Sequence, residues 1–349
     1  MIYRITGSKD ATIYQRNTDP DRTEQNTGVD SMLELSQEQH SAGTGSGVFN
    51  SRILIQFENF DTESLDINVD PDYYLHLYET DESRNLPSTV YLKIHPLLAS
   101  WHMGLGNFDD YPITKDKASW VYKSDSLWTN PGGDYNTDYV VLDRAEYNSK
   151  DINKDVTSIV EKWNDETIDN YGFIIKRIDS EEISTASLGT LKYFSTETNT
   201  IYQPRLEIKW DDSSWTTGSL TALDISDNII IGPSSLQGKY NNDSKVKIRV
   251  IGREKYPTKT YVTESVDTIT NYYLPSGSSY YSIIDAHTDE VVIPFDDDYT
   301  KLSCDSTSNY FNLWMDQFEP KRYYKLNFKV VNDGVEKYFK STQVFEVTK

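Results

Sequence analysis

Residues 100–120 read SWHMGLGNFDDYPITKDKASW and decide how the rest of the chain is organised. Glycines and a proline interrupt any regular element in this stretch. Its large aromatic side chains are Trp101, Phe108 and Trp120. Rings of this size need a core or a ligand to cover them. We therefore expect one long ordered loop, with a strand before it at residues 90–94 and a strand after it at residues 120–122.

Short alternating segments typical of β-strands extend outward from this loop. We count roughly nine of them before residue 211, separated by polar turns, and residues 52–57 (RILIQF) are apolar enough to be a central strand. This spacing is typical of a jelly-roll β-sandwich. One helix is expected over residues 155–164, with Asp155 as its N-cap. Its apolar face consists of Val156, Ile159, Val160 and Trp163.

The pattern changes after residue 211. Residues 211–218 and 232–242 are polar and contain glycine, and a strand at 225–231 could bridge two domains. About seven or eight closely spaced strand candidates follow, including a hairpin at Asn332-Asp333-Gly334. The chain is therefore predicted to be all-β. A jelly-roll β-sandwich with one short helix spans residues 1–212, a linker spans 213–242, and an immunoglobulin-like β-sandwich spans 243–349.

Charge and composition exclude several classes of partner. The 349 residues include 55 acidic and 34 basic ones, a net charge of −21, which repels nucleic acids and anionic membranes. Neither an apolar leader nor a membrane-length apolar run is present, so the chain is expected to be made in a cytoplasm and to remain soluble there. The single cysteine, Cys304, excludes an internal disulfide and is expected to be buried in a strand.

Six segments between residues 10 and 210 resemble one family when taken in order: ATIYQ, SRILIQF, SWHMGLG with the following ASW, LWTNPGGDY, DVTSIVEKWNDETIDNYGFIIKR and YFSTETNTIYQPRLEIKW. Together they resemble the DNRLRE domain, a jelly-roll β-sandwich of bacterial surface proteins and tailed-phage proteins. The matching positions are Arg52, Phe57, Trp101, Gly104, Gly106, Pro112, Ser119, Trp120, Trp163, Asn170, Tyr171 and Gly172. In the family these are chiefly scaffold positions, so the resemblance implies architecture rather than activity.

A second resemblance covers residues 271–330, which are similar to a module in structural proteins of large tailed bacteriophages. The two resemblances together imply a virion component assembled in the host cytoplasm. We therefore expect a non-enzymatic structural protein at the neck or tail. Its partners would be other virion proteins, such as portal, connector, tail or fibre components, and it would be multimeric in the particle.

Few residues suggest catalysis or a cofactor. The five histidines show no metal-ligand spacing, and Ser46 in GTGSGV does not match a nucleophile elbow. No catalytic residue and no cofactor are predicted. Calcium is the one metal to consider, because clustered aspartates supply the oxygen ligands it prefers, although none has EF-hand spacing. These clusters are residues 19–21, 66–72 and 296–298.

Exposed aromatic side chains suggest an alternative function. We predict a rim that contacts a glycan or a partner protein through Trp101, Phe108, Trp128 and Tyr135. A carbohydrate-binding module that contacts host surface glycans is the alternative to the structural role. Carboxylates in the same loops leave a polysaccharide depolymerase as a third hypothesis, with Asp109 or Asp110 essential, and with Asp134 and Asp138 nearby. Tyrosine doublets either place one ring of each pair at the surface or lie in strands buried on both faces.

Overall fold

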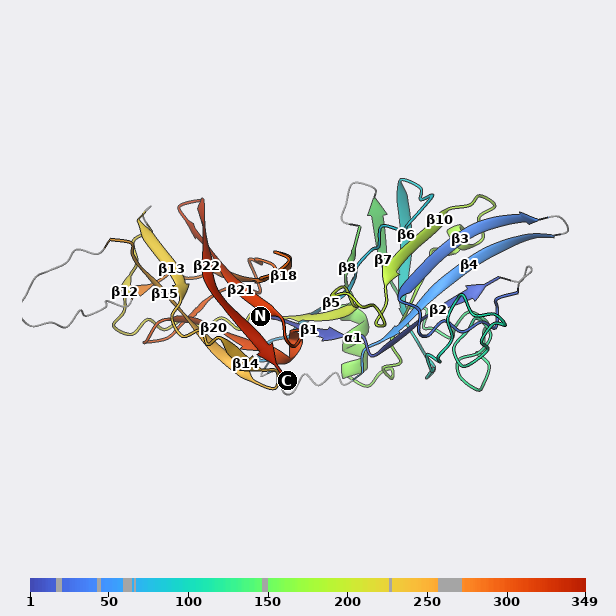
Figure 1. The fold of residues 1–349 in the computed structure, drawn as a ribbon, viewed down its shortest axis with the longest axis horizontal. Helices are drawn as coiled ribbons and strands as arrows, with labels where there is room; N and C mark the ends of the chain where they lie inside the picture. The colour runs from blue at the N-terminus through green and yellow to red at the C-terminus, as the bar shows by residue number, and fades with distance from the viewer. Residues whose placement is uncertain are drawn as a thin grey trace, which may run out of the picture. The chain divides into compact units, whose positions relative to one another are not determined.

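The computed structural model describes residues 1–16, 21–42, 45–58, 65, 67–145, 150–225, 228–256 and 272–349. The chain divides into two compact units. The N-terminal unit comprises Arg4–Thr62 and Asp72–Ile208, and the C-terminal unit comprises Met1–Tyr3, Glu63–Pro71 and Lys209–Lys349. Strands dominate both units, which confirms the predicted all-β class (Figure 1). No described helix is long and apolar enough to cross a bilayer.

Two sheets build the N-terminal sandwich. One has the order β1 (Ile2–Thr6), β11 (Arg205–Lys209), β5 (Asp72–Leu77), β8 (Ile152–Asp155). The other has the order β10 (Gly189–Phe194), β3 (Met32–Ala42), β4 (Gly45–Gln56), β9 (Phe173–Arg177), β6 (Thr89–Pro96), β7 (Val140–Ala145), and β2 (Lys9–Gln15) also pairs with β4. Ile53, Leu54 and Ile55 of β4 are fully buried, so the predicted central strand is confirmed. Burial on both faces explains why this strand is continuously apolar.

The predicted helix is α1 (Thr157–Asn164), and its apolar face is buried as expected. Its N-cap is Val156 rather than Asp155. The Asp155 carboxylate still accepts a hydrogen bond from the Thr157 amide at 2.9 Å, so it satisfies a free N–H of the first turn. A second helix, α2 (Asp179–Glu182), was not predicted, because four residues are too few to show a helical period.

Two further sheets form the C-terminal sandwich. The first has the order β13 (Ile229–Pro233), β15 (Lys245–Glu254), β20 (Asn309–Trp314), β19 (Ser303–Cys304). The second has the order β14 (Lys239–Asn241), β22 (Val335–Thr348), β21 (Tyr323–Asn332), β17 (Ser279–Asp285), β18 (Val291–Ile293). A stacked ring pair joins the two sheets, with Tyr281 of β17 and Phe311 of β20 at 4.1 Å between centroids. A 3-10 turn, η2 (Met315–Gln317), follows β20.

Local turn chemistry was predicted correctly in this unit. Asn332 pairs with Val335 at the end of the β21–β22 hairpin, and Asp333 and Gly334 have φ angles of 51° and 77°. These positive angles are those of a two-residue hairpin turn, so the predicted hairpin is confirmed. Cys304 is buried in β19, as expected, and burial raises the pKa of its thiol to about 11.

The segment expected to be a linker belongs to the sheets of the C-terminal unit. Within residues 213–242, β13 pairs with β15, β14 pairs with β22, and β12 (Thr221–Ala222) pairs with β16 (Tyr272–Tyr273). The strand expected at 225–231 to bridge two domains is β13, which begins at Ile229. These strands are short and interrupted by polar turns, and partners far along the chain complete them. Their sequence therefore lacks the sustained alternation of a strand.

Tyrosine doublets show both arrangements that the sequence allowed. In β17, Tyr280 and Tyr281 are both buried: Tyr281 stacks on Phe311 of the other sheet, and the Lys329 ammonium lies 4.5 Å from the Tyr280 ring centre. In β21, Tyr324 is buried and Tyr323 is 49% exposed. The doublet by itself therefore does not reveal whether a ring reaches the surface.

Candidate functional site

The long loop of the N-terminal unit is longer than expected and extends from β6 to β7. Residues 120–122, expected to be a strand, form only an isolated bridge between Tyr122 and Leu127. The Ser119 hydroxyl accepts hydrogen bonds from the amides of Val121 and Tyr122, at 3.3 and 3.1 Å, and bends the chain there. The apolar residues of this segment serve the interior of the loop instead of a sheet.

Two residues of the predicted aromatic rim are core residues, which corrects that prediction. Trp101 is 2% exposed and Trp128 is 3% exposed. Both belong to one buried cluster with side chains of β2, β4 and β9. Each indole N–H is satisfied internally, by the carbonyls of Tyr171 and Ser119 at 2.9 Å. Because the loop folds back onto the sheet, these rings offer no face to a sugar.

The other two rim residues are half-buried and already packed by the chain itself. The Arg22 guanidinium lies 3.9 Å from the centre of the Phe108 ring, and Tyr14 packs on that ring at 5.0 Å. Tyr135 packs against the His95 ring at 4.6 Å. The four predicted residues therefore do not form one exposed aromatic surface.

Asn26 anchors this loop, although the sequence did not indicate it. Its buried side-chain amide donates to the carbonyls of Met103 and Ala118, at 2.5 and 2.8 Å, and accepts from the Gly106 amide at 2.7 Å. Gly104 is required beside it, because its φ is +79° and an added Cβ would lie 2.4 Å from Asn26 Oδ1. Asn26 lies in a polar stretch that resembled an ordinary loop, so no local pattern could have revealed its role.

Two of the four acidic residues considered for hydrolysis, Asp110 and Asp134, hold turns instead. Asp110 accepts from the Thr114 hydroxyl at 2.5 Å and from the Asn107 amide at 2.9 Å, and these hydrogen bonds lower its pKa. Burial of Asp134 opposes ionisation, but hydrogen bonds from the amides of Thr129 and Asn130 outweigh it and lower the pKa. A general acid needs a raised pKa, so neither carboxyl fits that role. Asp109 is exposed, and Asp138 pairs with Lys162 at 2.5 Å.

The residues that the structure describes include no group of three or more His, Cys, Asp or Glu side chains placed to hold a metal ion. Two of the three acidic clusters named for calcium lie partly outside the described residues. In the third cluster, Asp296 accepts from the amides of Asp298 and Tyr299, and Asp297 pairs with Lys329 at 2.8 Å.

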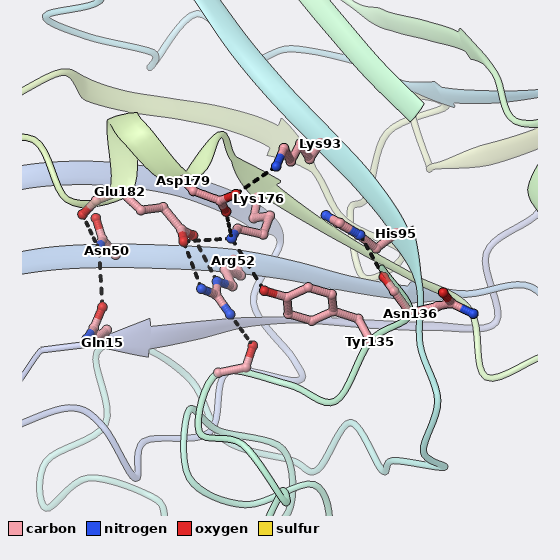
Figure 2. Close-up of polar contacts among 11 residues, drawn as sticks. Gln15, Asn50, Arg52, Lys93, His95, Tyr135, Asn136, Lys176, Asp179 and Glu182 are labelled. Carbon is pink, nitrogen blue, oxygen red and sulfur yellow. Dashed lines mark hydrogen bonds and ion pairs between the residues drawn. The ribbon is translucent and has the colours of Figure 1, made fainter. Parts of the chain in front are cut away.

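A network of charges, buried except for the exposed Asp179, lies beside the loop and was not foreseen (Figure 2). Arg52 of β4 donates from Nε and Nη2 to both carboxylate oxygens of Glu182, each at 2.8 Å, and from Nη1 to the Gly132 carbonyl at 2.7 Å. Lys176 of β9 lies 2.9 Å from Glu182 and 2.6 Å from Asp179. Lys93 of β6 pairs with Asp179 at 2.7 Å. The network thus joins three strands to α2.

Each carboxylate of this network is paired with two cationic side chains. Hydrogen bonds from Lys176 and Lys93 lower the pKa of Asp179 to about 2. Burial of Lys176 would lower its pKa, but Asp179 and Glu182 outweigh that effect and raise it. The Glu182 oxygens accept from two cations, so this carboxylate is poorly placed to take a proton from a substrate. Arg52 matched the resembled family as a scaffold position, and its contacts here join parts of the scaffold.

A pocket of about 520 Å³ lies next to the network. Its lining includes Gln15, Asn50, Arg52, Trp120 and Glu182. The Asn50 amide donates to Gln15 Oε1 at 3.1 Å and to the Glu182 carbonyl at 2.9 Å, whereas its buried Oδ1 has no hydrogen-bond partner. The Arg52 guanidinium lies 4.6 Å from the Trp120 ring centre. The pocket therefore brings together the Trp120 ring, the guanidinium packed against it and polar side chains. One of these, Asn50, has a buried oxygen without a hydrogen-bond partner.

No protein-family model matches this chain, and neither does any curated protein. Matches among solved structures include the adhesin domain of Epf from Streptococcus pyogenes, with 10% identity, 97% of this chain, 91% of that chain and a TM-score of 0.19. A DUF4785 family protein from Legionella pneumophila matches with 9% identity, 99% of this chain, 66% of that chain and a TM-score of 0.20. β-Glucuronidase 3 from Bacteroides uniformis matches with 8% identity, 91% of this chain, 35% of that chain and a TM-score of 0.19. This chain therefore spans about a third of that enzyme's length. Scores this low carry no argument about fold or function.

Proposed function

We propose that this protein is a non-enzymatic structural component of a tailed-bacteriophage particle, located at the neck or tail, that binds neighbouring virion proteins. The family resemblances of its two parts support the assignment to a particle. The construction of the long loop supports the binding role, and it is the observation that carries the proposal.

The long loop is held in one conformation by internal contacts and carries apolar side chains at its surface. Asn26 and the buried indoles of Trp101 and Trp128 hold it from inside. On the outside, Leu105 is 75% exposed and Tyr111 is 97% exposed. A tyrosine supplies a large contact area and is enriched at protein interfaces. A loop that is already ordered loses little conformational entropy when a partner binds it.

The charge network supports a role without catalysis. Its carboxylates are engaged by arginine and lysine side chains, and the loop carboxylates Asp110 and Asp134 have lowered pKa values. Catalytic acids and bases instead need pKa values tuned toward the working pH. The contacts of this network connect β4, β6, β9, α2 and the long loop.

Mass spectrometry of purified particles tests this function, because the protein should appear among the virion proteins in a reproducible copy number. Particles assembled with a Leu105→Ser/Tyr111→Ala variant should incorporate less of it than wild type. Asp109→Ala, an exposed change on the same loop, is the control and should leave incorporation unchanged. Absence of the wild-type protein from infectious particles would end the proposal.

Carbohydrate recognition is a second candidate, favoured by the pocket rather than by the predicted rim. The pocket places polar side chains beside the Trp120 ring, and Gln15 at the exposed end of β2 can exchange hydrogen bonds with a sugar hydroxyl. Calorimetric titration with host surface polysaccharide should show saturable binding that Gln15→Ala weakens and Tyr111→Ala leaves unchanged. Equal affinities for the two variants would place any glycan elsewhere.

A further inference from the structure

One face of β15 in the C-terminal unit carries a row of cations. The strand reads KVKIRVIGRE, and its inward side chains Ile248 and Val250 are fully buried. Alternate side chains of a strand point to opposite faces. The outer face of the sheet therefore carries Lys245, Lys247, Arg249 and Arg253. Residues two positions apart on this face are separated by about 6.8 Å along the strand. This stripe of basic residues lies on a chain whose net charge is −21.

Aromatic rings of the neighbouring strand hold part of this stripe in place. In the register of β15 with β20, Lys245 is opposite Trp314 and Arg249 is opposite Tyr310. The Lys245 ammonium lies 4.3 Å from the Trp314 ring centre, and the Lys247 ammonium lies 3.9 Å from that of Tyr310. Cation–π contacts of this kind restrict the lysine rotamers before any partner arrives.

The charge of the stripe is partly compensated within the unit. Asp305 accepts two hydrogen bonds from Arg249, at 2.9 and 3.1 Å, and lies 3.8 Å from Lys247. Apolar side chains share the same face, since Ile230 of β13 is 38% exposed and is paired with Arg253. The surface is therefore mixed, with cations, aromatic rings and aliphatic groups in alternation.

We propose that this outer face of β13, β15 and β20 is a docking surface for an acidic segment of a neighbouring protein, which rests on the protein-binding role proposed above. An extended peptide with carboxylates at every second residue repeats at the spacing of the stripe. When such a peptide lies on this face, its carboxylates point toward the stripe and its intervening side chains point away from it, so the contact is chiefly ionic. Nucleic acid fits less well, because its charge density is several times higher and the net charge of the whole chain repels it.

Fluorescence polarisation tests the proposal on the full chain, with a labelled heptapeptide in which glutamate alternates with valine and threonine. Binding at low ionic strength should weaken with added salt and should be absent for the glutamine counterpart of the peptide. We expect Lys245→Glu/Lys247→Glu to weaken binding at least about tenfold, which corresponds to roughly 1.4 kcal/mol. The neutral Lys245→Gln/Lys247→Gln should lie between this variant and wild type.

The control is Lys321→Glu/Lys340→Glu, which changes the net charge equally at exposed positions of the same unit. It should alter affinity less than about twofold. Circular dichroism of all variants checks that the sandwich is intact. An equal loss in the control would overturn the proposal, as would tighter binding of a heparin oligosaccharide than of the peptide. Self-association that disappears in Lys245→Glu/Lys247→Glu would instead assign the face to a second copy of this chain. Virion mass spectrometry is independent of these results, so this surface and the proposed function can fail separately.

Discussion

Arg52 and Glu182 form a bidentate ion pair, with both N–O distances at 2.8 Å, although 130 positions separate them in the chain. Their residues are 9% and 8% exposed. Arg52 also donates to the Gly132 carbonyl, so one side chain connects β4, α2 and the long loop. A pair this buried is costly to break on one side, because the remaining charge is left without a partner.

Replacing either partner should therefore destabilise the N-terminal unit strongly. We expect Arg52→Met or Glu182→Gln to cost about 3–5 kcal/mol, measured by urea unfolding with tryptophan fluorescence. Asp125→Asn removes the exposed Lys117–Asp125 pair, in which the Asp125 side chain is 86% exposed, and should leave the free energy of unfolding nearly unchanged. Similar costs for the buried and exposed pairs would contradict a structural role for the network.

Trp101→Ala should behave as a core substitution. Loss of this buried indole is expected to cost about 3–5 kcal/mol, because a cavity forms next to β2, β4 and β9. Thermal unfolding measures the effect, and Tyr111→Ala, at a 97% exposed position, should change stability by less than about 0.5 kcal/mol. A stable Trp101→Ala variant with altered glycan binding alone would restore the surface role first expected for this residue.

Asn26→Asp keeps the shape of the side chain and removes its donors. Asn26 Nδ2 now donates to the carbonyls of Met103 and Ala118, which would instead face a carboxylate oxygen. We expect the free energy of unfolding to fall by about 3 kcal/mol. Hydrogen exchange should then accelerate at the Gly106 amide and along the loop. Asn107→Asp, a half-buried change in the same loop, serves as the comparison and should leave loop protection nearly unchanged.

The buried carboxyl of Asp10 should make stability depend on pH. Burial raises its pKa from 3.8 to about 7, against the opposing hydrogen bond from the Thr196 amide at 2.7 Å. Between these values the folded protein binds a proton that the unfolded chain has released. The contribution of Asp10 is therefore full below about pH 4 and is lost as the pH rises toward 7, by an amount on the order of 4 kcal/mol.

Asp10→Asn should flatten this part of the profile, measured as the free energy of unfolding at several pH values between about 4 and 8. Asp179 acts in the opposite direction at lower pH, because its pKa is lowered to about 2 and its stabilisation is lost as the pH falls through that value. An unchanged slope between wild type and Asp10→Asn would show that Asp10 is ionised in the folded protein throughout.

Patterns confined to neighbouring residues were sufficient for the fold class. A continuous apolar run predicted the central strand β4, helical spacing predicted the buried face of α1, and Asp333-Gly334 predicted a hairpin. These features depend on backbone preferences and on side-chain direction within a few residues. The short strand β14 was missed, and the strand expected at 225–231 was placed in a linker, because the partners of β13 and β14 lie elsewhere in the chain.

The candidate sites depended on contacts between distant segments. The sequence showed that Trp101 and Trp128 need covering but could not show whether a ligand or the chain covers them, and the chain does so. Arg52 and Glu182 are unremarkable in their own segments and acquire a role only when β4 lies beside α2. By itself, then, the sequence determined an all-β chain with its central strand, helix face and hairpin. Only the tertiary structure decided which aromatic rings are buried and which charges are paired, because burial and ion pairing are properties of segments brought together in space and leave no periodic trace along the chain.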